Sequence, residues 1–224
     1  AGIDRDAMSV SGSIKFDINL KALKNFTENE VNYYKEKYLF VCGSTHPGEE
    51  EILIDSFIDL NKENKHLVLA PRHPERFGEI KELVNKKNLS NILYTEISSN
   101  PDIKSDVTIV DVIGRLLDFY EIADCVFIGG TLVDHGGQNF LEPAFFNKPI
   151  ISGRSTYNFD EISKKLSDLG LLKFVSNKDE ISSAVENIEA ISDSLKKDTN
   201  LWLNENRGAS KFISKKVCKE FNLI

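Results

Sequence analysis

Residues 125–143, CVFIGGTLVDHGGQNFLEP, join an apolar run to two glycine pairs and then to a helix start. The four apolar residues at 125–128 leave no polar face, so they predict a buried strand with helices covering both sides of its sheet. The glycine pairs at 129–130 and 136–137 permit backbone with positive φ and let a ligand approach the bare main chain. This order of strand, glycine-rich loop and helix is typical of an anion site.

The helix start after the second glycine pair has a recognisable capping pattern. Asn139 is a good N-cap residue, and Glu142 follows three residues later. Pro143 falls in the first turn, where its missing N–H costs little. A helix from about Phe140 would direct free N–H groups at the loop, where a phosphate could sit. The alternative is that the glycines only form a turn and the polar residues only cap a helix, and spacing does not decide between these.

Composition limits the class of protein. With 224 residues, 41% of them hydrophobic, the chain can bury one core of a single large domain. The net charge of −7 argues against a broad nucleic-acid surface. No apolar run approaches the roughly 20 residues of a membrane span, so a soluble intracellular chain is expected. Cys42, Cys125 and Cys218 form no C-x-x-C pair, which predicts buried free thiols and no metal site.

Apolar strand patterns alternate with helical patterns along most of the chain. The predicted strands are 38–42, 66–70, 91–95, 107–110, 125–128, 148–152 and 171–175. The predicted helices are 49–61, a run ending near 87, 112–124, a helix from about 140, 160–170, 179–191, and 195–221 with a break near 207–208. This alternation predicts an α/β fold with a doubly wound parallel sheet, whose ligands bind at the carboxyl ends of the strands.

Polar residues follow several of these strands. Ser44 and Thr45 follow the first strand and offer hydroxyl groups to a ligand, or alternatively cap the next helix. Arg72 follows the second strand, where its planar guanidinium suits phosphate or carboxylate. Arg76 is expected on a helix surface, and His73 either touches a ligand or caps and packs. Because these loops converge at one edge, a nucleotide or sugar-phosphate site is expected there.

Taken together, the loops resemble the C-terminal domain of the bacterial 3-deoxy-D-manno-octulosonic acid (Kdo) transferases. The family sequences (A/G)STHxGEE, PRHxERF, GGSxVxxGGHNxLEP and GPxxxNF have counterparts at residues 43–50, 71–77, 129–143 and 153–159. Two shorter family sequences, VxVxGxxKFD and NxGA, correspond to residues 8–17 and 206–209. The resemblance covers almost the whole chain in the family's order.

The resemblance implies the Rossmann-like C-terminal half of a GT-B glycosyltransferase. Residues 1–37 would be a connector from an N-terminal domain plus a lead-in, and residues 38–224 the nucleotide-sugar-binding domain. The donor would be CMP-Kdo and the acceptor a lipid A precursor, with inversion at the sugar and no metal or cofactor. The whole enzyme would work at the cytoplasmic face of the bacterial inner membrane. Only the whole enzyme would contact the membrane, and this chain by itself would be soluble. The general-base glutamate would lie in the N-terminal domain, so this chain would contain no catalytic residue and would bind donor without transferring sugar.

The resemblance also implies the roles of individual residues. Arg72 and the loop at 136–139 would hold the leaving phosphate, Glu142 the ribose hydroxyls, and the loop at Asp111 the base. The implied donor-binding residues are Ser44, Thr45, Arg72, Gly130, Gly136, Gly137, Gln138, Asn139 and Glu142. Further candidates on the same loops are His46, His73, Asp111, Thr131 and Asn158.

The chain departs from the family pattern at four of these loop positions. Gln138 stands where histidine is usual, Val112 and Arg115 replace threonine and glutamate, and Arg154 replaces proline. These changes are compatible with a different donor. The alternatives are therefore a GT-B transferase or epimerase that uses a UDP-sugar, and a nucleotide-binding or partner-binding module without catalysis.

Overall fold

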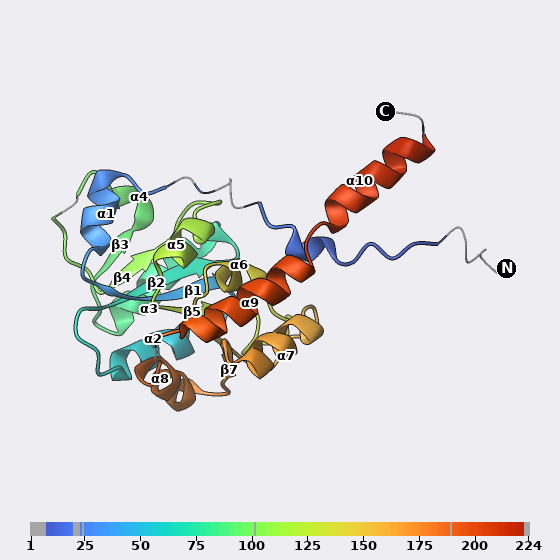
Figure 1. Cartoon of the computed structure of the whole chain (residues 1–224). Coiled ribbons are helices and arrows are strands. Elements are labelled where there is room, and N and C mark those ends of the chain that lie inside the picture. The colour runs from blue at the N-terminus through green and yellow to red at the C-terminus, as the bar shows by residue number, and fades with distance from the viewer. Residues whose placement is uncertain (1–7, 20–22, 24, 101, 189, 222–224) are drawn as a thin grey trace.

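The computed structural model describes residues 8–19, 23, 25–100, 102–188 and 190–221 (Figure 1). Parts of the expected connector, residues 1–7, 20–22 and 24, lie outside the described residues. The core is a seven-stranded sheet of order β3-β4-β2-β1-β5-β6-β7, in which every neighbouring pair is parallel. The predicted doubly wound α/β fold is therefore confirmed.

All seven predicted strands form. They are β1 (Tyr38–Thr45), β2 (Lys65–Pro71), β3 (Asn91–Leu93), β4 (Val107–Ile109), β5 (Cys125–Ile128), β6 (Ile150–Ser152) and β7 (Leu172–Phe174). From β1 the chain builds the sheet in one direction through β2, β4 and β3, and from β5 it builds in the other. The order thus reverses between β1 and β5, which is the position where open α/β sheets bind ligands.

The helices are α1 (Glu28–Tyr34), α2 (Glu49–Asp59), α3 (Phe77–Lys86), α4 (Tyr94–Ile97), α5 (Leu116–Ile122), α6 (Leu141–Phe145), α7 (Asp160–Leu169), α8 (Lys178–Glu186), α9 (Asp193–Glu205) and α10 (Ala209–Glu220), with short 3₁₀ turns η2 (Ile14–Phe16) and η4 (Pro74–Arg76). The helix expected from residue 112 begins only at Leu116, since Gly114 has a φ of 81° that interrupts helical backbone. The predicted break in the C-terminal helix occurs at Gly208, which has a φ of 105°.

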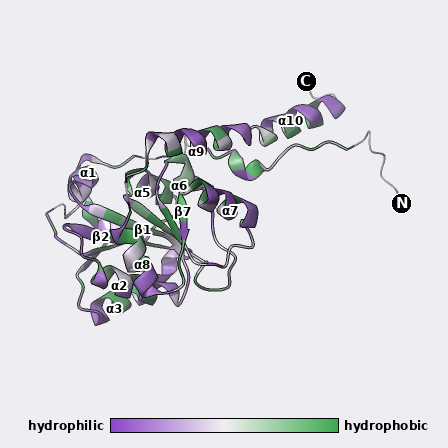
Figure 2. Ribbon diagram, turned by 60° about the horizontal axis from the view of Figure 1, so that its bottom comes forward, coloured by the Kyte–Doolittle hydropathy of each residue, from purple (hydrophilic) through white to green (hydrophobic). Residues whose placement is uncertain are grey.

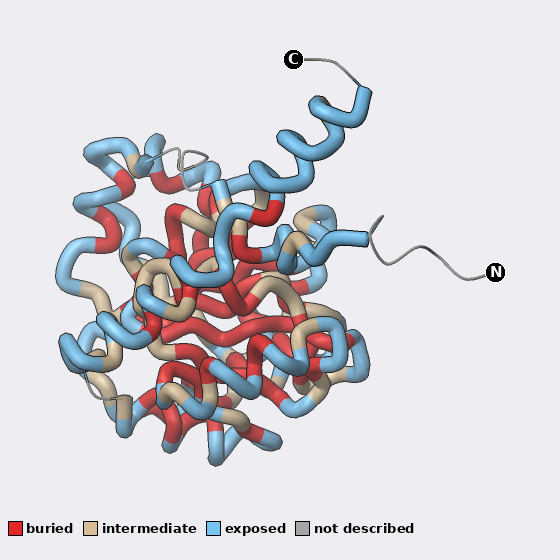
Figure 3. The backbone as a smooth tube through the Cα atoms, turned by 45° about the vertical axis from the view of Figure 1, so that its right-hand side comes forward, coloured by how far each residue is buried: buried red, intermediate tan, exposed pale blue. Residues whose placement is uncertain are grey.

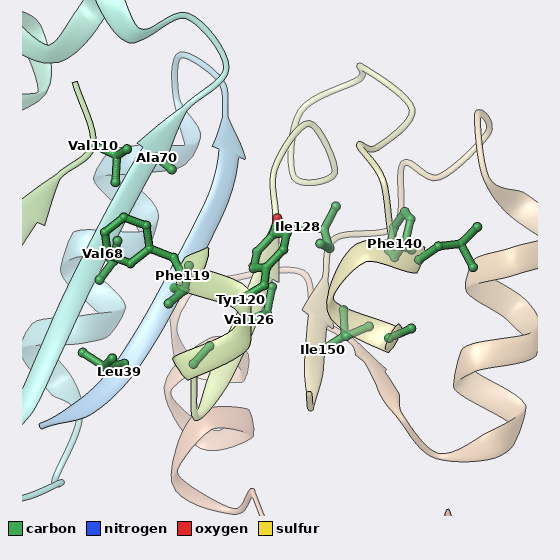
Figure 4. Close-up of a cluster of buried hydrophobic side chains, with 14 of the residues drawn as sticks. Leu39, Val68, Ala70, Val110, Phe119, Tyr120, Val126, Ile128, Phe140 and Ile150 are labelled. Atoms are coloured by element: carbon green, nitrogen blue, oxygen red, sulfur yellow. The ribbon is translucent and has the colours of Figure 1, made fainter. Parts of the chain in front are cut away.

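Helices cover both faces of the sheet because successive strand residues point to opposite sides. In β1, Leu39 and Val41 join a cluster with α5, α6 and α9, shown in Figure 4, whereas Phe40 and Cys42 join a second cluster with α2, α3 and α8. The apolar strands lie between these helix layers in Figure 2, and the buried parts of the chain follow them in Figure 3. Cys42 and Cys125 are buried free thiols, as predicted, while Cys218 is half-buried on α10.

Residues 15–17 hold the N-terminal segment against the break between α9 and α10. The Asp17 carboxylate accepts hydrogen bonds from the N–H groups of Gly208 and Ser210, both at 2.6 Å. The Phe16 ring packs edge-on against Trp202, with ring centroids 5.3 Å apart. From this junction α10 projects away from the body of the domain, and the N-terminal segment leaves beside it (Figure 1).

The lead-in at residues 25–34 is packed into the domain by a buried arginine. Arg115 donates a hydrogen bond to the Asn25 carbonyl at 3.1 Å and lies 3.9 Å from a Glu30 carboxylate oxygen. Its guanidinium also lies 5.0 Å from the centre of the Phe26 ring. Arg115 is 8% exposed, so this departure from the family pattern has a role in packing.

Candidate functional site

The candidate site lies at the switch point, where β1 ends between β2 and β5. Gly43 is in register with Ala70 of β2 and with Ile128 of β5, so the three strands end at one level. The N–H of Arg72 donates to the Thr45 carbonyl at 3.0 Å, which joins the loop after β2 to the loop after β1. Three of the predicted loops therefore meet, as the topology required.

Ser44 occupies an unusual backbone conformation at the end of β1. Its φ is 55°, in the left-handed region that non-glycine residues seldom adopt. The strand register shifts between Gly43 and Thr45, and a Cβ at Gly129 would collide with the Ser44 carbonyl. The Ser44 side chain has no hydrogen-bond partner among the described residues and is half-buried, so its hydroxyl is available at the site.

The backbone after β5 does bind an anion, and that anion belongs to the chain itself. The Glu49 carboxylate, which is fully buried, accepts hydrogen bonds from the N–H groups of Gly130 (2.7 Å), Thr131 (3.0 Å), Leu132 (3.0 Å) and His46 (2.9 Å). Burial raises the pKa of Glu49, and the four N–H donors oppose that shift. The N–H groups that follow the first glycine pair of the predicted anion site are thus occupied by Glu49, from the start of α2.

Thr131 and Thr45 are both turned into the protein. Thr131 is 1% exposed, and its hydroxyl donates to the Ile128 carbonyl at 2.6 Å. The Thr45 hydroxyl donates to Glu50 at 2.9 Å. Together with the contacts to Glu49, these bonds assign Thr45, Gly130 and Thr131 to the frame of the site.

Arg72 and Arg76 lie four residues apart and have opposite environments. Arg76 donates to the buried Glu50 carboxylate at 2.8 Å, and only 16% of its side chain is exposed. The expectation that Arg76 lies on a helix surface is therefore wrong, because Glu50 draws it inward. Arg72 is exposed, and no carboxylate pairs with it in the described part of the chain. His73 is exposed beside it, 3.7 Å from Glu75.

Two histidines from different loops stack beside Arg72. The rings of His46 and His135 have centroids 4.3 Å apart and planes 21° apart. The Gln138 amide nitrogen lies 3.2 Å from Nε2 of His46. Burial lowers the pKa of His46, and the neighbouring His135, His73 and Arg72 lower it further, while Glu50 opposes them.

Sequence reasoning missed His135, which occupies a variable position in the glycine-rich loop. The sequence did contain a signal for His135, namely that several histidines follow strands whose ends the topology brings to one edge. The chain has four histidines, and three of them, at 46, 73 and 135, follow strands that end at this edge.

Gly136 and Gly137 form the turn that packs this loop onto the next one. Their φ angles are 73° and 77°, and a Cβ at Gly136 would collide with the Tyr157 ring. The Gly136 N–H donates to the Ser155 hydroxyl at 3.1 Å, and the Gly137 N–H donates to the Gly130 carbonyl at 2.9 Å. Asn158 donates from its side chain to the His135 carbonyl at 3.0 Å. These polar groups therefore bond within the loops.

Asn139 and Glu142 form a pair at the start of α6. Asn139 accepts a hydrogen bond from the Leu141 N–H and donates one to the Glu142 carboxylate, both at 3.1 Å. Burial raises the pKa of Glu142, and the bond from Asn139 opposes that shift. In the described residues no hydrogen-bond partner is found for the second Glu142 oxygen, so this carboxylate can still accept a ligand hydroxyl. The helix has only five residues, which limits its dipole.

Two predicted positions lie apart from this group. Asp111 follows β4, two strands away from β1, and its carboxylate accepts hydrogen bonds from the Thr95 N–H and hydroxyl at 3.2 and 2.5 Å. Arg154 is exposed and donates to the Ser176 hydroxyl at 3.4 Å. The described residues contain no group of three or more His, Cys, Asp or Glu side chains that could hold a metal ion. Within the same residues, no helix combines the length and apolar character needed to cross a bilayer.

Comparison with known proteins finds relatives of the chain. No model of a known protein family matches it. The 3-deoxy-D-manno-octulosonic acid transferase of Haemophilus influenzae is 34% identical over 216 residues, which are 93% of this chain and 50% of the relative. The chain is related to the Kdo transferases. A bifunctional glycosyltransferase/methyltransferase of Fusobacterium nucleatum is also 34% identical, over 100% of this chain and 34% of the relative.

A solved structure shows the same fold. The C-terminal CMP-Kdo binding domain of WaaA from Acinetobacter baumannii superimposes with a TM-score of 0.61 and 24% identity, over 83% of this chain and 93% of that one. This confirms the predicted Rossmann-like fold. The chain spans half the length of the Haemophilus relative and about a third of the Fusobacterium one.

Proposed function

We propose that this Kdo transferase homologue is the donor-binding domain of an inverting, metal-independent enzyme. The enzyme moves Kdo from CMP-Kdo to a lipid A precursor at the cytoplasmic face of the inner membrane. The observation that carries the proposal is Arg72, an exposed cation that pairs with no carboxylate among the described residues, at the carboxyl end of β2 beside the switch point. The similarity to the C-terminal CMP-Kdo binding domain supports the choice of donor.

Arg72 and Ser44 are assigned to the leaving phosphate. Negative charge grows on this phosphate as the bond to the sugar breaks, and without a metal a fixed guanidinium must stabilise it. The Ser44 hydroxyl can donate a hydrogen bond from the neighbouring loop. His46, held by Gln138, lies in the same group.

Glu142 is assigned to the ribose. An ionised carboxylate only accepts hydrogen bonds, and its free oxygen suits the ribose hydroxyls. Asn139 holds the carboxylate through its other oxygen and also accepts the Leu141 N–H. It lies one residue before the N-cap of α6, which is Phe140 and not Asn139 as predicted. Thr45, Gly130, Thr131, Gly136 and Gly137 then act on the donor indirectly, by holding the loops that carry these groups.

The acceptor and the general base are assigned to the part of the enzyme that relatives have beyond this chain. The chain alone is therefore expected to bind the donor nucleotide without transferring sugar. Incubation with CMP-Kdo and a lipid A precursor should give no Kdo-modified lipid, and measurable transfer would contradict this part of the proposal.

Calorimetric titration with CMP tests the donor site, with UMP and UDP as competitors. Wild-type protein is expected to prefer CMP, and Arg72→Ala to weaken CMP binding by about tenfold or more, the loss expected for a charge-assisted phosphate contact. Lys81→Ala is the matched control, because it removes a positive charge from the exposed face of α3. Equal or tighter binding of UDP would favour a UDP-sugar enzyme, and unchanged CMP binding by Arg72→Ala would contradict the assigned phosphate position.

A further inference from the structure

His46 and His135 form a stacked pair that the donor assignment does not explain. His46 follows β1 and His135 follows β5, so the pair spans the switch point. A Cβ at Gly130 would lie 3.3 Å from both His46 Cδ2 and His135 Cβ. Glycine at this position thus leaves room for the two rings to meet.

The charged groups around the pair come from every neighbouring loop. Arg72 and His73 face it from the loop after β2, and Glu50 faces it from α2. Two other carboxylates nearby are already engaged: Glu49 accepts the His46 N–H, and Asp134 accepts a hydrogen bond from the Ser155 hydroxyl at 3.1 Å. The pair therefore has mostly positive neighbours, which disfavour its protonated form until an anion arrives.

The stacking geometry opposes a second positive charge on the pair. Two imidazolium rings with centroids 4.3 Å apart would repel each other strongly. The contact from the Gln138 amide fits a neutral His46 whose Nε2 accepts and whose Nδ1 carries the proton. A phosphate next to the rings would favour adding one proton from the solvent.

We propose that His46 and His135 bind the donor phosphate as one unit that takes up a single proton on binding. The pair then supplies a second positive charge beside Arg72, and His135 is an additional phosphate-positioning residue. This inference rests on the donor site proposed above. Donor affinity is consequently expected to fall as pH rises through neutrality, where the added proton becomes harder to hold.

The test uses the methyl ester of CMP, because the second phosphate ionisation of CMP itself, with a pKa of about 6, would mask the histidines. Calorimetry is run at about pH 6.5 in buffers that differ in ionisation enthalpy, which counts the protons taken up. Wild-type protein is expected to take up about half a proton or more under these conditions. His135→Gln and His46→Gln should each take up fewer protons than wild type and bind about tenfold more weakly, with a smaller dependence on pH.

His73→Gln is the matched control, since it removes an exposed imidazole from the same edge without disturbing the stack. Proton uptake is expected to persist in this variant. Histidine NMR titration of the unliganded protein gives a second readout, in which His135→Gln should raise the midpoint of His46 by removing a positive neighbour.

The outcomes separate this inference from the donor site. Binding of the ester with no proton uptake overturns the histidine pair and leaves the donor site standing, as does uptake that disappears in His73→Gln. If neither cytidine nucleotide binds, the donor site and the pair are both overturned. An unchanged His46 midpoint in folded His135→Gln also overturns the coupling.

Discussion

Two carboxylates follow the two strands at the switch point, and the protein uses them differently. Glu49 begins α2 after β1, is fully buried, and accepts four backbone N–H groups at 2.7 to 3.0 Å. Glu142 lies in the first turn of α6 after β5 and has Asn139 as its one hydrogen-bond partner among the described residues. In the sequence both are acids that follow a glycine-rich loop at a helix start.

The two carboxylates have different roles at this edge of the sheet. Glu49 neutralises the N–H groups of the loop after β5 and thereby joins the ends of β1 and β5. Glu142 keeps an oxygen free at a cost in stability, since burial of a carboxylate with a single partner is unfavourable. One carboxylate therefore fixes the frame of the site, and the other is available for a ligand.

Replacing Glu49 should have the largest effect. Glu49→Ala leaves four N–H groups without their acceptor in a buried loop and is expected to lower the free energy of unfolding by about 3 kcal/mol or more. Urea unfolding followed by fluorescence of Trp202, the single tryptophan, measures the change. Glu51→Ala is the matched control, because this side chain is 61% exposed in the same helical turn. The control should change stability by less than about 0.5 kcal/mol, and a similar loss in both variants would contradict the anchor role of Glu49.

Arg72 and Arg76 give a second contrast between a residue that binds within the protein and one that is assigned to the ligand. Arg76→Ala leaves Glu50 buried without its cation and should cost about 2 to 4 kcal/mol, whereas Arg72→Ala should cost less than about 0.5 kcal/mol. Binding should show the reverse order, with CMP affinity lost in Arg72→Ala and kept by folded Arg76→Ala. Thermal unfolding and calorimetry on both variants measure the two quantities. Equal stability losses would mean that the ion pair with Glu50 adds nothing to the frame.

These contrasts mark how far the sequence could be interpreted. Continuous apolar runs predicted the central strands β1 and β5, because a strand buried on both faces has no polar side. The edge strand β7 was predicted although its Lys173 is exposed. The reversal at the switch point then placed the loops of Ser44, Arg72 and Gly136 at one edge without any side-chain detail. The sequence also predicted the break in the C-terminal helix near Gly208. The structure shows a positive φ at this glycine, which excludes continued helix.

The sequence could not show which polar residues bond within the protein. Three of the four N–H partners of Glu49 lie on another loop, 81 residues away in the case of Gly130. Glu50 likewise lies 26 residues from Arg76. Local spacing gives Glu49 a favourable place at a helix start, but only the packed sheet brings the N–H groups to it. For the same reason the helical pattern that follows Arg76 predicted a position on the helix surface, and this prediction was wrong.

Ser44, like Glu142, is assigned to the ligand, and replacing it should change stability less than the substitutions above. Its φ of 55° is comfortable for glycine and costly for serine, so Ser44→Gly should raise stability by about 0.5 to 1 kcal/mol. Ser44→Ala keeps the strain and should be no more stable than wild type. Both variants lose the hydroxyl and should weaken CMP binding equally, which separates backbone strain from the proposed ligand contact. A loss of stability in Ser44→Gly would argue that the serine hydroxyl has an internal partner.

An effect of similar size, in the opposite direction from that of Glu49→Ala, is expected for Glu142→Gln. Burial raises the pKa of Glu142 in the folded protein, so its contribution to stability is full below the unfolded pKa and is lost as pH rises through the folded pKa. Glutamine does not titrate, so the variant should match wild type near pH 4 and exceed it by about 0.5 to 1 kcal/mol near pH 7. Urea unfolding at both pH values measures this difference, and calorimetry should show weaker CMP binding by the stabilised variant. If Glu142→Gln is instead destabilised at neutral pH, as expected for Glu49→Gln, then Glu142 is a second structural anchor and the ribose must bind elsewhere.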